Sequence, residues 1–384
     1  MSQAALAGLV GRSESWLSQV ERGIRSVDRL SVLLDMSRVL HVDIESLIGR
    51  PWQFAPNGEP VSQGLDEVRR VFTRYDHLLG SDLPPLPATA DLRSRVERLH
   101  EDYQAARYGQ VIQDLPDLLT VIDAVPRDTG EDRSELLRVY VSAYVAAAKL
   151  LTKLGIADLA AVAADRAATV AVETDSLELR GLAAYQVVCA LLRADRAEEA
   201  ERLALRMAEE VGRPSTPETP ILTSVAGSLC LISAVAAARR ADRDEAFRRL
   251  DQAAALAEQL GADGNHGWTA FGPTNVAIHR VSVAAELGDA AEALRAATVV
   301  DPDRLPEGLR SRRAQMHLDL AWAQAQRKRD AESLLHLMEA ERSAPEAIRY
   351  NIMVRETIRE LLSRSRQPGT NALQELAVRA GALE

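Results

Sequence analysis

The sequence predicts an all-α protein, with a small N-terminal helical domain followed by a solenoid of stacked helical hairpins. Apolar residues recur at the spacing of one helical face in segment after segment, as in Ala200, Leu203, Ala204, Met207 and Val211. No segment alternates between apolar and polar residues for long, so strands are not expected. The chain has 384 residues, more than one hydrophobic core usually serves, and we therefore expect more than one unit.

The first fifty residues predict two short helices. Residues 2–10 have apolar side chains on one face, and Gly11 permits a tight turn after them. Ser13 is expected to cap a second helix over residues 14–21, which turns Leu17 inward. Two short helices joined by a glycine-containing turn are typical of a helix-turn-helix unit, whose second helix enters the major groove of DNA.

The motif residues of this stretch are Gln3, Leu6, Ala7, Val10, Gly11, Ser13 and Trp16 to Gly23, followed by a helix over residues 30–40. At this spacing they resemble the Cro and phage-repressor type of helix-turn-helix, the xenobiotic-response-element family. The resemblance implies a DNA-binding set in which Gln3 and Arg12 approach phosphates, Glu14, Ser15 and Gln19 face base edges beside Ser13 and Ser18, and Arg22 and Arg25 contact the backbone. Glutamine, serine and glutamate all have suitable partners on base edges.

Two alternatives stay open for this segment. The two helices could simply cap the array as a helical hairpin, and Ser15 and Ser18 could be solvated helix surface. Family members also carry another helix before the one that contains Gln3. Either the native chain begins further upstream than Met1, or another part of the chain covers the gap, or this domain binds DNA poorly; we expect the first.

We place the DNA-binding domain at residues 1–52 and a linker at residues 53–88. The first part holds six Arg and six acidic residues, so the net charge of -10 lies in the remainder. Turn-forming Pro56-Asn57-Gly58 marks the boundary. Within the linker we expect one helix over residues 61–79 and then a stiff, proline-rich stretch.

Residues 89–384 are expected to form the repeat domain. A turn element recurs with its centre at Gly109, Gly155, Ala194, Ala241, Gly288 and Arg329. Each period holds two helices, which must stack on neighbours to bury their apolar faces. In the segment 287–293 this part resembles the tetratricopeptide-like repeat superfamily, and the combination resembles regulators of an actinobacterial type. Ala200, Ala246 and Ala293 are expected where helices approach most closely.

One patch of the array has unusual chemistry for this aromatic-poor chain. Residues 264–275 gather His266, Trp268, Phe271 and Asn275 among glycines and a proline that should interrupt the helix. One hypothesis is a pocket for a peptide or small molecule, with the two aromatic rings as stacking walls and the Asn275 amide reading the ligand backbone. The alternative is an inter-repeat loop held by a buried tryptophan.

Several function classes lack their motifs. The lysines Lys149, Lys153 and Lys328 follow no glycine-rich loop, and there is no Gly-x-Ser-x-Gly or HExxH string, so we expect neither an enzyme nor a cofactor or metal site. The two cysteines favour a reducing, cytoplasmic setting. Residues 221–238 carry no charge, but we expect a buried core helix there and no membrane span.

The resulting prediction is a cytoplasmic transcriptional regulator that binds double-stranded DNA as a homodimer. Its repeat groove would take a peptide or small-molecule effector, or a protein partner. The acidic total means that any DNA contact must be local. The alternative is a repeat-based protein adaptor with a vestigial DNA-binding head.

Overall fold

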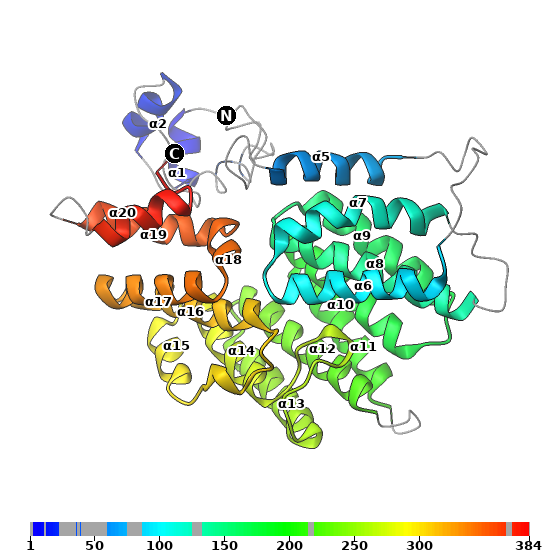
Figure 1. Cartoon of the computed structure of the whole chain (residues 1–384). Helices are drawn as coiled ribbons and strands as arrows, with labels where there is room; N and C mark the ends of the chain where they lie inside the picture. Colours follow the sequence, from blue (N-terminus) through cyan, green and yellow to red (C-terminus); the bar gives the residue numbers. More distant parts are fainter. Residues whose placement is uncertain are drawn as a thin grey trace. The chain divides into compact units, whose positions relative to one another are not determined.

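The structure, a computed structural model, describes residues 3–10, 13–22, 36, 39, 60–74, 87–124, 133–213, 219–365 and 371–383. All regular structure in these residues is helical, which confirms the predicted all-α class (Figure 1). The chain divides into two compact units, Met1–Phe54 and Ala55–Glu384.

The first unit contains helices α1 (Gln3–Leu9) and α2 (Glu14–Glu21). They are held together by a small apolar cluster formed by Leu6, Ala7, Val10, Leu17 and Met36, with Trp16 and Val39 packed against it. Leu17 is the best buried of these, at 0% exposure. The inward faces of both helices therefore lie where the apolar spacing predicts them.

The second unit begins with α5 (Pro60–Phe72) and continues with six helical hairpins. These are α6 (Thr89–Gln104) and α7 (Tyr108–Ala124), α8 (Arg133–Lys153) and α9 (Ala157–Val172), α10 (Leu177–Arg193) and α11 (Ala197–Val211), α12 (Pro220–Arg239) and α13 (Arg243–Leu260), α14 (Pro273–Glu286) and α15 (Ala290–Ala297), and α16 (Arg310–Gln326) and α17 (Asp330–Ser343). Short 3-10 turns, η2 (His266–Trp268) and η3 (Pro302–Arg304), precede α14 and α16, and α18 (Pro345–Arg349), α19 (Ile352–Arg364) and α20 (Asn371–Arg379) follow.

The recurring turn element has one backbone geometry throughout. A residue with left-handed φ ends the first helix of each hairpin, at Ala106, Gly155, Asp195, Ala241, Gly288 and Lys328, successively 40 to 49 residues apart. Each donates its N–H three residues back, and the next residue donates five residues back, as Gly288 does to Ala285 at 2.9 Å and Asp289 to Ala284 at 2.9 Å. This is the Schellman motif, which satisfies the free carbonyls at a helix end. At Gly155, Ala241 and Gly288 the predicted turn centre is itself the residue with left-handed φ, which makes three of the six predicted centres.

Small residues allow the helices to approach closely. Ala200, Ala246 and Ala293 are each 0% exposed, as expected for close helix contacts. A Cβ atom added to Gly181 of α10 would lie 2.4 Å from Cγ1 of Val225 in α12. The helix α12, long and apolar enough to cross a membrane by length and composition, is 78% buried here and forms part of the core.

The interpretation of α5 as a linker helix needs correction. Val68 and Phe72 of α5 are 0% and 3% exposed and belong to the main core of the helical unit. Gly64 lets α5 lie against Ile112 of α7, since an added Cβ atom would be 2.4 Å from Cγ2 of that residue. In α9, Arg166 donates to the Phe72 carbonyl at 3.0 Å. The helix α5 belongs to the array, because burying its apolar face against α7 removes that face from water.

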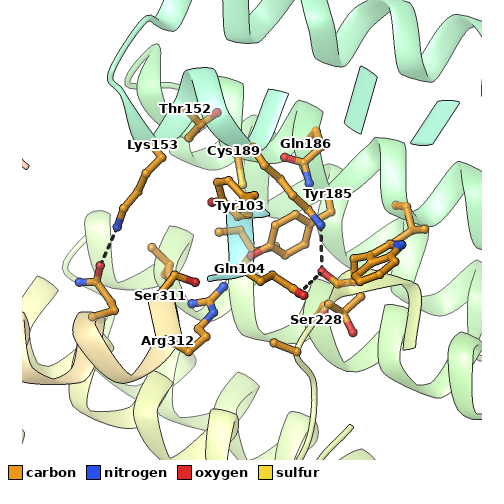
Figure 2. A pocket seen from close by; sticks show the side chains of 18 of the residues that line it. Tyr103, Gln104, Thr152, Lys153, Tyr185, Gln186, Cys189, Ser228, Ser311 and Arg312 are labelled. Atoms are coloured by element: carbon orange, nitrogen blue, oxygen red, sulfur yellow. Dashed lines mark hydrogen bonds between the residues drawn. The ribbon is translucent and has the colours of Figure 1, made fainter. Parts of the chain in front are cut away.

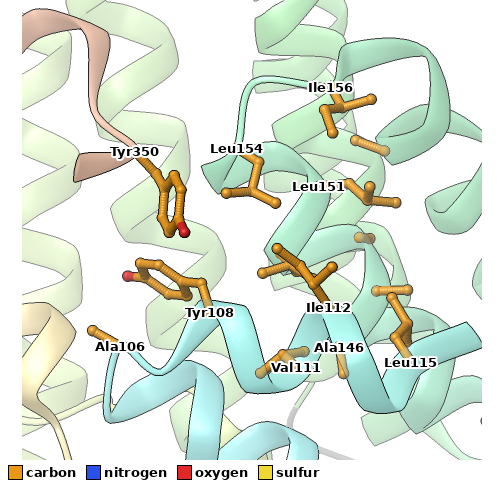
Figure 3. Close-up of a cluster of buried hydrophobic side chains, with 14 of the residues drawn as sticks. Ala106, Tyr108, Val111, Ile112, Leu115, Ala146, Leu151, Leu154, Ile156 and Tyr350 are labelled. Carbon is orange, nitrogen blue, oxygen red and sulfur yellow. The ribbon is translucent and has the colours of Figure 1, made fainter. Parts of the chain in front are cut away.

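The array returns to its own beginning. The first helices of successive hairpins contact one another in order, and α16 in turn contacts α6. Near this closure the Tyr108 and Tyr350 rings lie beside each other (Figure 3), and their centroids are 6.4 Å apart. The Gly109 N–H donates to Glu346 Oε2 at 2.8 Å, across 237 residues of chain. The six first helices therefore surround a common interior.

Candidate DNA-binding and ligand-binding sites

The start of α2 is built to present polar groups to solvent. Ser13 has extended backbone, and its Oγ accepts from the Trp16 N–H at 3.2 Å, as the predicted cap. Ser13, Glu14 and Ser15 are exposed, while Leu17 anchors the opposite face of the helix. The side chains expected to face base edges at this end of α2 therefore lie outside the core.

The remaining residues of the predicted DNA-binding set differ in their surroundings. Ser18 and Gln19 are half-buried on α2. Arg22 folds back, and its Nε donates to the Ser18 carbonyl at 3.1 Å. Gln3, expected at a phosphate, donates its side-chain amide to the Glu21 carboxylate and so ties α1 to the end of α2. Two further predicted contacts, Arg12 and Arg25, lie outside the described residues.

The N-terminal residues match a known domain family. Residues 1–47 match the model of a helix-turn-helix domain. The N-terminal unit is a helix-turn-helix domain. In such domains the second helix of the motif is the one that enters the major groove. The match supports a DNA-binding regulator. A comparison with curated proteins found no match to the chain.

Outside the helix-turn-helix domain, the helical unit contains a cavity of about 340 Å³. It is lined by residues from α6, α8, α10, α12, α14 and α16, together with the start of α7 and the loop around η2. Figure 2 shows the side chains of Tyr103, Lys153, Tyr185 and Arg312 directed into this space. The cavity is the interior that the first helices of the hairpins surround.

The cavity wall carries four cationic side chains, Lys149, Lys153, Arg193 and Arg312. Among the described residues none of the four forms an ion pair with a carboxylate. Lys149 Nζ donates instead to the Trp268 carbonyl at 2.8 Å, Lys153 Nζ to Gln315 Oε1 at 3.3 Å, and Arg193 to the Thr152 carbonyl at 3.1 Å. Removal from bulk water and the Arg312 charge lower the pKa of Lys149 to about 7 and that of Lys153 to about 8.

The acidic groups near the cavity already have hydrogen-bond or ion-pair partners elsewhere in the protein. The Asp319 carboxylate accepts from Ser282 and, at 2.9 Å, from Gln315, and burial raises its pKa to about 6. Glu286 pairs with Arg239 at 2.8 Å. The cavity therefore has an excess of positive charge in a chain whose net charge is negative.

Two hydroxyl groups of the wall lack protein partners. The Tyr108 hydroxyl and Ser228 Oγ are buried and have no hydrogen-bond partner within the part of the chain that the structure describes. Buried polar groups are satisfied in the great majority of cases, so such groups in a cavity wall mark positions where a ligand can bond.

The predicted aromatic patch, residues 264–275, lines the cavity only in part. Trp268 lines the cavity and stacks on His100, with ring centroids 5.2 Å apart and an interplanar angle of 3°. His266 is exposed and does not line the cavity. Of the four residues proposed for ligand contact, the structure places only Trp268 in the wall.

The proposed roles of Phe271 and Asn275 need correction. Phe271 is 0% exposed, because its ring fills the space over Gly227, where an added Cβ atom would lie 2.0 Å from Cζ. Asn275 is 1% exposed, and its carbonyl accepts from Nδ1 of His279 at 2.9 Å. Both side chains are packed inside the protein and do not face the cavity. Gly272 and Pro273 start α14 directly after Phe271, so Asn275 already lies in the first turn of that helix.

Sequence reasoning missed the cations of the cavity. The available signal was the rarity of lysine: the chain has three, and two of them, Lys149 and Lys153, lie one helical turn apart in the apolar helix α8. Lysine is seldom buried unless it has a partner, so a lysine among alanines and leucines indicates a specific role. No group of three His, Cys, Asp or Glu side chains among the described residues is placed to hold a metal ion.

Proposed function

We propose that this protein is a sequence-specific transcriptional regulator of the xenobiotic-response-element type. The observation that carries the proposal is the helix-turn-helix domain at residues 1–47, with the exposed first turn of α2 presenting Glu14 and Ser15. Serine and carboxylate groups can both read base edges in the major groove. On this proposal the protein acts in the cytoplasm, and it is not an enzyme.

The helical unit is proposed to be a tetratricopeptide-like sensor domain. Its repeated Schellman turns and its central cavity support this role. An effector in the cavity would alter DNA affinity through the difference in its binding to two conformations of the protein. Because one short helix reads few bases, the regulator is proposed to act as a homodimer on paired half-sites.

The test is selection of bound fragments from genomic DNA by the full chain. We expect enrichment of a two-fold symmetric site, with one dimer per site by light scattering. Glu14→Ala and Gln19→Ala should relax the preference at particular base pairs, each by roughly 1–3 kcal/mol of discrimination. As a matched control, Glu332→Ala on the exposed start of α17 should change nothing. No enriched sequence, or unchanged preferences in both α2 variants, would overturn the proposal.

A further inference from the structure

We propose that the central cavity of the helical unit binds a small organic anion, whose carboxylate or phosphate group is held by Lys149, Lys153, Arg193 and Arg312. The proposal rests on the sensor role proposed above and names the chemical class of the effector. The cations come from three different inner helices, α8, α10 and α16, and line the same cavity.

The cations of the cavity carry an electrostatic cost. Taking a cation out of bulk water costs free energy unless an anion compensates for it. Lys149, Lys153 and Arg312 are half-buried and Arg193 is exposed. None of the four forms a close ion pair with a carboxylate among the described residues, and the Asp319 charge acts on Lys153 only from beyond ion-pair distance. Like charges gathered in one cavity repel one another as well. An anion that binds between them offsets both penalties, so the cavity favours an anionic ligand over a neutral or cationic one.

The rest of the cavity wall is apolar and aromatic. Leu182, Val225 and Ile232 supply apolar surface, and Tyr103 and Tyr185 supply aromatic rings. The unpartnered hydroxyl groups of Tyr108 and Ser228 can bond to polar atoms of the ligand body. The wall therefore suits a molecule with an anionic end and an apolar or aromatic body.

The cavity is small. A volume of about 340 Å³ lies at the lower end of the range for drug-sized ligands, roughly 300–1,000 Å³. The cavity suits a compact molecule, and a long peptide would not fit inside it. A bare inorganic ion would leave the apolar wall uncovered.

Binding would reach the η2 loop through Lys149. Its Nζ donates to the carbonyl of Trp268, and the same carbonyl accepts from Gln104 Nε2 at 3.2 Å. A ligand anion competes for the Lys149 ammonium group and so changes how the loop is held. Gly267, Trp268 and Ala270 all have left-handed φ, near 59°, 59° and 56°. For Trp268 and Ala270 this backbone is unfavourable, which makes the loop ready to adopt a second conformation.

The test uses two fluorescent probes that share one aromatic skeleton and differ by a single sulfonate group. The full chain is titrated with anionic 8-anilino-1-naphthalenesulfonate and with neutral N-phenyl-1-naphthylamine. We expect the anionic probe to bind at least about tenfold more tightly, since hydrogen bonds to charged groups contribute enough for such a ratio. Equal affinities for the two probes would overturn the proposal.

Variants locate the binding and separate it from general hydrophobic uptake. Lys149→Met and Lys153→Met should each weaken the anionic probe about tenfold or more and leave the neutral probe unchanged. Lys328→Met, at the exposed third lysine, is the matched control and should alter neither affinity. Without ligand, the two cavity variants should melt at a higher temperature than the parent protein, because a desolvated charge has been removed. Anion affinity that persists in both cavity variants would contradict the assignment.

Competition then distinguishes the two sources of negative charge. Benzoate and phenyl phosphate are tested as competitors of the anionic probe, with neutral benzamide as the control. Displacement by benzoate indicates a carboxylate ligand and displacement by phenyl phosphate a phosphate ester, while benzamide acting as well as either would overturn the proposal. The probe experiments need no DNA. Failure to enrich a DNA site would therefore overturn the regulator assignment and leave the ligand site standing, and the reverse also holds.

Discussion

The side-chain amides of Gln104 and Asn265 hydrogen-bond to each other in both directions. Gln104 Nε2 donates to Asn265 Oδ1 at 2.8 Å, and Asn265 Nδ2 donates to Gln104 Oε1 at 2.7 Å. This pair joins the end of α6 to the loop before α14, across 161 residues of chain. Gln104 and Trp268 line both the central cavity and a second hollow beside residues 306–310. The amide pair therefore secures the wall between the two.

Removing one member of this pair should destabilise the helical unit. In Asn265→Ala the Gln104 carbonyl oxygen, on a side chain only 6% exposed, loses its partner. We expect a loss of about 1–3 kcal/mol in the free energy of unfolding, measured by urea denaturation. Gln110→Ala is the matched control, because that amide bonds to Asp114 on the exposed face of α7 and should matter by less than about 0.5 kcal/mol. Equal effects in the two variants would contradict the structural role of the pair.

Substitutions at Gly227 and Phe271 test whether the Phe271 ring is packed in the core. Gly227→Ala forces a methyl group into the Phe271 ring and should cost about 1–3 kcal/mol of stability by overpacking. Gly308→Ala should be nearly neutral, because nothing lies within 4 Å of its added Cβ atom. Adding Phe271→Leu to Gly227→Ala should recover part of the loss. Thermal unfolding of the four proteins provides the measurement, and a neutral Gly227→Ala would show that the ring is not packed there.

The cap of α2 should support DNA binding indirectly. Ser13→Ala removes the acceptor for the Trp16 N–H and should destabilise the helix-turn-helix domain by about 0.5–2 kcal/mol. The loss of affinity should be similar for all DNA sequences, since the change loosens the reading helix as a whole. Ser15→Ala, at an exposed position without a capping bond, should leave stability unchanged and serves as the control. A change of sequence preference in Ser13→Ala would contradict a purely structural role.

Stability without ligand should rise with pH just above neutrality. Lys149 and Lys153 face His100, Cys189, Arg193, Arg312 and Asp319, and their pKa values are lowered to about 7 and 8 from 10.5. In this range the unfolded chain binds more protons than the folded chain, so the free energy of unfolding increases as pH rises. Below pH 7 both states are protonated, and the destabilisation is fully present.

The measurement is the urea midpoint between pH 7 and 8.5. This window lies above the titration of Asp319, whose pKa is raised to about 6, and below that of Cys189, whose pKa burial raises to about 11. The rise should disappear in the Lys149→Met, Lys153→Met double variant. Affinity for the anionic probe should fall over the same window as the lysines lose their charge. A urea midpoint that does not respond to pH in the parent protein would show that the lysines remain solvated.

Local pattern was sufficient for the secondary structure. Helical spacing and the Gly-Asp turn around Gly288 predicted the hairpins, because a Schellman turn depends on a few consecutive residues. Ser13 was assigned as a cap for the same reason. The helix α5 was misplaced in a linker because its amphipathic face fits a linker helix and a packed helix equally well. Its contact with Ile112 decides between the two.

The candidate cavity could not be predicted from spacing along the chain. Lys149, Arg193 and Arg312 are separated by tens of residues or more, and only the return of α16 to α6 brings them to one interior. Phe271 looked available for a ligand because aromatics are rare here, but Gly227 leaves a gap that the ring fills. The helices, their turns and the helix-turn-helix motif follow from the amino-acid order, because each depends on neighbours within a few residues. Tertiary structure alone decided which side chains share the interior, because burial and charge depend on contacts between distant helices.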